Sequence, residues 1–172
     1  MAGSLIKIDE EIVSSAVASV TLTGIDSTYD VYMVKSNKIL TTNDTTNMRL
    51  RVTTSGTGDS TSNYDRASKI LSTSPFINSF GTNQTSWSIS ATGNGTSGQE
   101  TTQGIFYLFN FNNSSEYSFY TLEAVRLDST SSLAGNMGGG VHTVTQSCDG
   151  VEFIEGGGST FTGNFTLYGL AK

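Results

Sequence analysis

Residues 104–127, GIFYLFNFNNSSEYSFYTLEAVRL, contain the densest aromatic and aliphatic runs in the chain. Two such runs, 105–111 and 117–127, flank the polar residues 112–115. Asn and Ser favour turns because their side chains can hydrogen-bond to nearby backbone. Two β-rich runs joined by a short polar break predict a long antiparallel hairpin. We take this hairpin as the centre of the fold.

The first run of the hairpin is apolar at every position from 105 to 109. A half-buried strand needs apolar residues only at alternate positions, so we expect both faces of this strand to be covered. One face would meet the core. The other would meet an N-terminal arm, another subunit or the segment 128–140, which we expect to be a long loop ending in three glycines.

The N-terminal residues 1–15 form a second apolar stretch, interrupted by Lys7 and by the acidic residues 9–11. Two interpretations stay open: a first strand of the domain, or an arm that docks on a neighbour. Together with the hairpin, this stretch supplies the residues we predict at an interface. They are Leu5, Ile6, Ile8, Ile12, Phe106, Tyr107 and Phe109.

The rest of the chain has the period-two alternation of short strands separated by Gly-, Ser- and Asn-rich turns. Residues 64–71 match helix and strand spacing equally well, and residues 72–84 contain Pro75, which indicates a loop or an edge strand. We predict strands at 16–22, 29–35, 48–54, 85–91, 141–146, 151–154 and 161–170. The whole pattern predicts one all-β domain over residues 1–172, an antiparallel β-sandwich or jelly roll of eight to ten strands with at most one short helix.

Composition narrows the classes of partner. The net charge is −6, and the nine Lys and Arg residues are scattered, so we expect no nucleic-acid partner. No stretch approaches the roughly 20 apolar residues of a membrane-spanning helix, and we expect no membrane partner. The start of the chain lacks the pattern of a signal peptide, which favours synthesis in the cytoplasm. The single cysteine, Cys148, excludes a disulfide within one chain.

The sequence contains only weak matches to catalytic or ligand-binding motifs. Residues 93–98, GNGTSG, match the dinucleotide pattern G-x-G-x-x-G, but we expect a strand after them, whereas a nucleotide site needs a helix. His142 is the only histidine, and six residues of strand, about 20 Å, separate it from Cys148. The two can form a dyad only if the chain folds back between them.

Carboxylates gather only at residues 9–11 and at the pair Asp26 and Asp30. Exposed strand-end carboxylates explain both groups. We therefore predict that the protein is not an enzyme and that it has no catalytic, cofactor or metal site.

Three segments carry a resemblance to a known group of proteins. They are IKIDEEIVSSAVASVTLTGIDSTYDVYMV at 6–34, YLFNFNNSSEYSF at 107–119 and GNFTLYGL at 163–170. They resemble small virion-associated proteins of tailed phages, especially marine ones. The last segment is also similar to the final strand of phage jelly-roll modules in tail fibres and capsid decorations. The resemblance implies a place on the virion surface and brings no catalytic motif with it.

Two functions follow as expectations. The first is a capsid decoration or cement protein, a homotrimer that stabilises the shell by binding the major capsid protein or another virion protein. The second is a tail-fibre or head-fibre module that binds host glycans, for which Trp87, the tyrosines and the Asn-rich loops are suitable residues.

Overall fold

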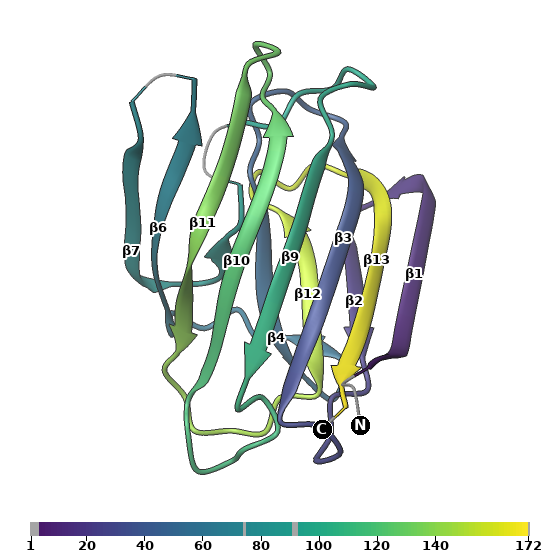
Figure 1. The fold of residues 1–172 in the computed structure, drawn as a ribbon, viewed down its shortest axis with the longest axis vertical. Helices are drawn as coiled ribbons and strands as arrows, with labels where there is room; N and C mark the ends of the chain where they lie inside the picture. Colours follow the sequence, from purple (N-terminus) through teal and green to yellow (C-terminus); the bar gives the residue numbers. More distant parts are fainter. Residues whose placement is uncertain (1–3, 74, 91–92, 172) are drawn as a thin grey trace.

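The computed structural model describes residues 4–73, 75–90 and 93–171. Within these ranges the chain contains thirteen β-strands and no helix (Figure 1). The strands are β1 Leu5–Val17, β2 Ser19–Thr23, β3 Val31–Thr41, β4 Met48–Thr54, β5 Thr57–Gly58, β6 Tyr64–Ser72, β7 Ile77–Gln84, β8 Trp87–Ser88, β9 Thr102–Phe109, β10 Ser118–Leu127, β11 Leu133–His142, β12 Gly150–Glu155 and β13 Phe161–Leu170.

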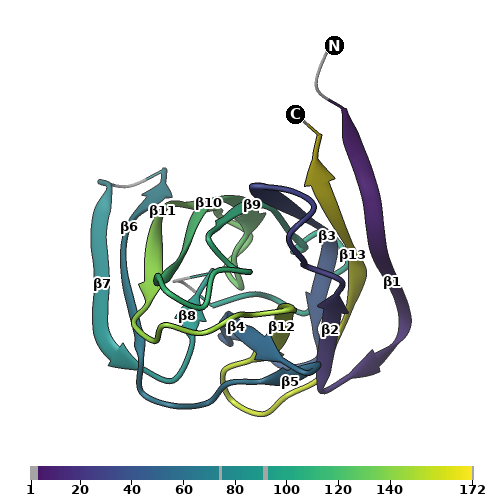
Figure 2. The ribbon, with the colours of Figure 1, turned by 90° about the horizontal axis from the view of Figure 1, so that it is seen from below.

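The strands form two antiparallel sheets. The large sheet has eight strands in the order β1-β13-β3-β9-β10-β11-β6-β7. The small sheet has the order β2-β12-β4-β5, with β8 paired to β4. Figure 2 shows the large sheet curving around the small one, with β7 and β1 at its two ends. The predicted all-β antiparallel sandwich is confirmed. The strand number exceeds the expected eight to ten, in part because β5 and β8 are two-residue strands.

The predicted central hairpin is present as β9 and β10. Its register runs from Phe109 opposite Phe119 to Thr102 opposite Arg126. Side chains alternate strictly along β9: Phe106 is buried, whereas Ile105 and Tyr107 are exposed. Only one face of this strand therefore meets the core of the same chain.

Aromatic side chains join the two sheets. Phe153 of the small sheet packs between Phe106 and Phe165 of the large sheet, with ring centroids 5.8 Å and 4.7 Å apart. All three are at most 1% exposed. Close contact between aromatic rings adds to the free energy gained from burying their area. These rings therefore occupy the centre of the core.

The segment 128–140 is not the loop that the glycines suggested. Only its first residues form a turn, and β11 begins at Leu133 and lies between β10 and β6. Packing requires a glycine at position 140 of this strand. A Cβ there would lie 2.8 Å from the Tyr120 ring and 2.9 Å from Nε1 of Trp87. This segment therefore extends the sheet and does not cover the outer side of β9.

Two open sequence interpretations are resolved at the ends of the large sheet. Residues 64–71, which could have been helix or strand, lie in β6, and the Pro75 segment leads into the edge strand β7. The N-terminal stretch forms β1, which pairs with β13. The chain then bends at Ala18 and enters the small sheet as β2.

Two predicted strands are shorter than expected. Of residues 85–91, only Trp87–Ser88 form a strand, and Ala91 lies outside the described residues. The strand predicted at 141–146 ends at His142.

We predict opposite outcomes for substitutions at neighbouring positions of β9. Phe106→Ala should lower the free energy of unfolding by about 3–5 kcal/mol, because it removes a buried ring from the core. Tyr107→Ser should change it by roughly 0.5 kcal/mol or less, because the side chain is on the surface. Urea unfolding monitored by the fluorescence of the single, buried Trp87 measures both. Equal losses in the two variants would contradict the assigned faces.

Candidate functional site

The convex side of the large sheet carries a group of exposed apolar residues. We call this group the outer apolar face, and its members are between 39% and 52% exposed. They come from β9, β10 and β11 and are Ile105, Tyr107, Phe119, Val125, Leu133 and Met137. The strand registers place them on the same side of the sheet, opposite the buried Phe106 and Leu122. Contiguous exposed apolar patches are typical of interaction surfaces, so this face is a candidate for one.

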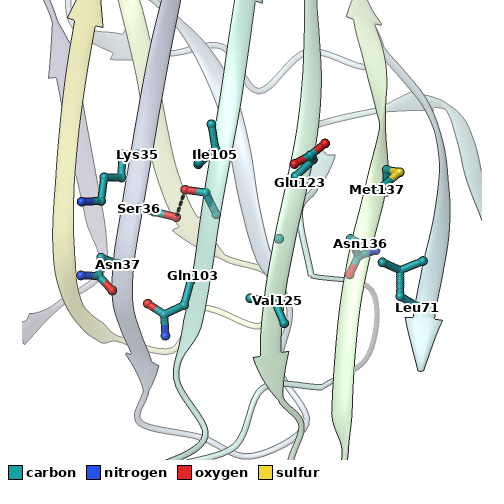
Figure 3. Close-up of a pocket in the computed structure, with 12 residues that line it drawn as sticks. Lys35, Ser36, Asn37, Leu71, Gln103, Ile105, Glu123, Val125, Asn136 and Met137 are labelled. Atoms are coloured by element: carbon teal, nitrogen blue, oxygen red, sulfur yellow. Dashed lines mark hydrogen bonds between the residues drawn. The ribbon is translucent and has the colours of Figure 1, made fainter. Parts of the chain in front are cut away.

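A hollow of about 450 Å³ lies within this face (Figure 3). Ile105, Glu123 and Met137 stand along one side of it, and Gln103 and Val125 stand along the other. The residues between these two rows include Gly104 and Ala124, which are small and buried. The face is therefore grooved across the strands and can accept a protruding side chain from a partner.

Charged side chains are interspersed among the apolar ones. One row of the sheet, followed through the registers from β3 to β6, reads Lys35, Ile105, Glu123, Met137 and Lys69. Lys35, Glu123 and Lys69 are all exposed. A partner that bound here would have to offer both apolar surface and charges in a matching order, which would make the contact specific.

The structure places the seven predicted interface residues in three settings. Leu5, Ile6, Ile12 and Tyr107 are exposed; Ile8 and Phe109 are half-buried; Phe106 lies in the core. Because its ring contacts the core, Phe106 cannot contribute to an interface. Reading residues 105–109 as an ordinary alternating strand would have separated Phe106 from Tyr107.

Sequence reasoning missed several exposed residues. Val125, Leu133 and Met137 belong to the outer apolar face, and Phe76, Ile77 and Phe80 lie at or beside β7. Leu133 and Met137 lie in the segment 128–140, which the three glycines predict to be a loop. The signal for β7 was present in PFINSF at 75–80, which has three large apolar residues and no charge.

The only histidine and the only cysteine lie in one buried polar cluster. Ser118 is opposite His142 in the register, and its hydroxyl lies 3.7 Å from Sγ of Cys148. Nε2 of His142 lies 3.1 Å from a carboxylate oxygen of Asp59, and the Tyr64 hydroxyl donates to the Asp59 carbonyl at 2.6 Å. The chain thus brings His142 and Cys148 to the same end of the core, which the sequence interpretation had left open.

This cluster is closed to solvent. His142 and Cys148 are both 0% exposed, so a substrate cannot reach either side chain in this conformation. Burial raises the pKa of the Cys148 thiol, which keeps it in the less reactive thiol form. The arrangement fits a structural role for both residues.

The same burial makes the cluster sensitive to acid. Burial lowers the pKa of His142 below its usual value, and the neighbouring carboxylate of Asp59 offsets this only in part. Burial alone would raise the pKa of Asp59, but hydrogen bonds from Thr61 and the contact with His142 outweigh it and lower that pKa. Both groups therefore favour the folded state at neutral pH and lose that contribution as the pH falls.

We predict that thermal stability falls as the pH is lowered from 7.5 to 5. The unfolded chain protonates His142 near its ordinary pKa of 6.5, whereas the folded chain resists protonation until lower pH. The Asp59 contribution is lost only below that carboxyl's ordinary value of 3.8. In His142→Gln, the slope between pH 7.5 and 5 should be flatter. Melting curves at several pH values measure this, and equal slopes in both proteins would rule out His142 as the cause.

The glycine-rich loop at 93–98 surrounds a side chain of the protein itself. A carboxylate oxygen of Glu100 accepts a hydrogen bond from the Ser97 amide at 3.0 Å, and the other accepts one from the Ser131 hydroxyl at 2.9 Å. A Cβ on Gly95 would overlap that carboxylate. The loop is therefore packed against a carboxylate of the same chain.

Two further features bear on ligand binding. Trp87 is completely buried and donates its indole N–H toward the Asp65 and Val141 carbonyls, at 3.2 Å and 3.3 Å, so it cannot stack on a sugar. A polar hollow of about 450 Å³ does exist at one end of the sandwich, where Asp26, Asp30 and the loop 110–114 meet.

In the described part of the chain, no group of three or more His, Cys, Asp or Glu residues is placed to hold a metal ion.

Comparisons with known proteins add no family to this picture. No protein-family model, no curated protein and no solved structure matches the chain. Over the described residues, no helix has the length and apolar character needed to cross a membrane.

Proposed function

We propose that this chain is a structural protein of a tailed-phage virion, a capsid decoration protein that binds the shell through its outer apolar face. The observation that carries the proposal is the exposure of six large apolar side chains on one grooved sheet face. The three segments that resemble phage virion proteins favour the same assignment. The partner would be the major capsid protein or another virion protein, and the protein would act as a homotrimer of jelly-roll domains on the virion surface.

The free energy of burying this face, set against the cost of association, favours a protein that binds in several linked copies. Complete burial of one large apolar side chain yields roughly 1.5–3 kcal/mol. Association costs an estimated 4–15 kcal/mol or more, and a large part of that cost is loss of translational and rotational freedom. A trimer would lose that freedom once for all of its copies that contact the shell. Clustering therefore strengthens attachment without requiring a larger face on each copy.

We predict that substitutions on the outer apolar face release the protein from virions without unfolding it. Val125→Glu adds a charge to the face at a half-exposed position and should sharply lower the amount bound per particle. Thr57→Glu adds the same charge at an exposed position of the small sheet and should leave binding unchanged. Quantitative gels of purified particles measure both. Equal binding of Val125→Glu and the parent protein would exclude this face as the shell contact.

A glycan-binding tail or head fibre is the second candidate, and the polar hollow formed by Asp26, Asp30 and the loop 110–114 favours it. Carboxylate and amide groups can hydrogen-bond to sugar hydroxyls. Copy number separates the two functions, because a decoration protein is present in numbers close to those of the shell subunit and a fibre in only a few copies. A low copy number, with glycan binding that is lost in Asn112→Ala, would establish the fibre and exclude the decoration protein.

A further inference from the structure

The two ends of the large sheet are free edges. Among the described strands, β1 pairs within this sheet only with β13, and β7 pairs only with β6. Figure 2 shows the two strands at opposite ends of the curved sheet. A free edge presents unpaired backbone N–H and C=O groups and can accept a strand from another chain.

Both edges carry exposed apolar side chains. At or beside β7, Phe76, Ile77 and Phe80 are 66%, 53% and 78% exposed. Natural proteins usually protect free edges with charged residues, yet the sequence of β7, INSFGTNQ, contains none. On β1, Leu5, Ile6 and Ile12 are 51%, 43% and 69% exposed.

The direction of the strands allows the two edges to pair with each other. All neighbours in the eight-stranded sheet are antiparallel, so β1 and β7 run in opposite directions. Rotation about an axis parallel to the strands therefore brings β7 of one copy antiparallel to β1 of the next. The curvature of the sheet (Figure 2) favours closure of such a head-to-tail series over a straight ribbon.

The two edges also differ in charge. Strand β1 contains Lys7, Asp9, Glu10 and Glu11, one positive and three negative groups that sum to −2. Strand β7 is uncharged, and its neighbour β6 contains Asp65, Arg66 and Lys69, which sum to +1.

Glu10 and Lys69 lie in the same row of the sheet, which runs through Thr166, Lys35, Ile105, Glu123 and Met137. If the rows stay aligned across the junction, Glu10 of one copy lies two strands, about 10 Å, from Lys69 of the next. Pairing of β7 with β7 would place only like-charged Lys69 side chains on either side of the junction.

We propose that β7 pairs with β1 of a second copy of this chain, and that three copies close into a ring. The pairing is argued from the edges alone, whereas the number three rests on the proposed function. In the ring each copy contributes one acidic and one uncharged edge, and no free edge of the large sheet remains. The outer apolar face stays open for the shell.

The test uses two variants, each of which disrupts one of the two strands that pair between copies. Phe80→Lys places a charge on β7, and Ile12→Lys places one on β1; both positions are highly exposed, so the fold should survive. Light scattering should show three chains for the parent protein and one chain for each variant. An equimolar mixture of the two variants retains one intact β1 and one intact β7, and it should form a two-chain species.

Other outcomes would overturn the ring. A parent protein that is a monomer, a dimer or an open polymer at high concentration contradicts it. So does a Phe80→Lys variant that remains trimeric, or a mixture that stays monomeric. Val125→Lys, on the outer apolar face, is the matched control. It should remain trimeric but should no longer bind the shell. Loss of shell binding by a folded Val125→Lys variant supports the proposed function even if the edge pairing fails.

Discussion

The contact on which the structure depends is the packing of Phe153 between Phe106 and Phe165. It joins the small sheet to two strands of the large one, and Phe161 extends it with a centroid distance of 5.9 Å to Phe165. Rings of this size leave little freedom in the register of the strands that carry them, because a shift by one residue would turn each ring to the surface. The alternation along β9 and β13 follows from that constraint, and so does the identity of the outward residues.

The unequal width of the two sheets explains where apolar surface is left over. The register places Ile77 on the same side as Ile70, which is buried, yet Ile77 is 53% exposed. The five strands of the small sheet do not extend far enough to cover β7. The same mismatch leaves Ile6 partly exposed on β1. Both edges thus expose side chains on the inward as well as the outward side, and a neighbouring chain can bury both.

One cluster of polar groups lies near one end of the core, where Asp59, Tyr64, Ser118, His142 and Cys148 meet. Burying these groups is tolerable because most of their polar atoms find a partner within the chain. The Nδ1 atom of His142 has none among the described atoms. These residues therefore fill the core and interact within it. The exposed apolar side chains of the outer face lie on the large sheet.

The sequence by itself determined the fold class, the central hairpin and most strand positions, because alternation with period two and Asn- or Ser-rich turns are local signals. It also identified Tyr107 and the β1 residues as candidates for an interface. Tertiary structure alone decided that Gly138–Gly140 belong to a strand, since the reason for Gly140 is the approach of Tyr120 and Trp87 from other strands. It also decided that Phe106 and Trp87 are core residues and that β1 and β7 are the two edges. Burial and edge position depend on which strands become neighbours, and that is a property of the whole chain rather than of any local pattern.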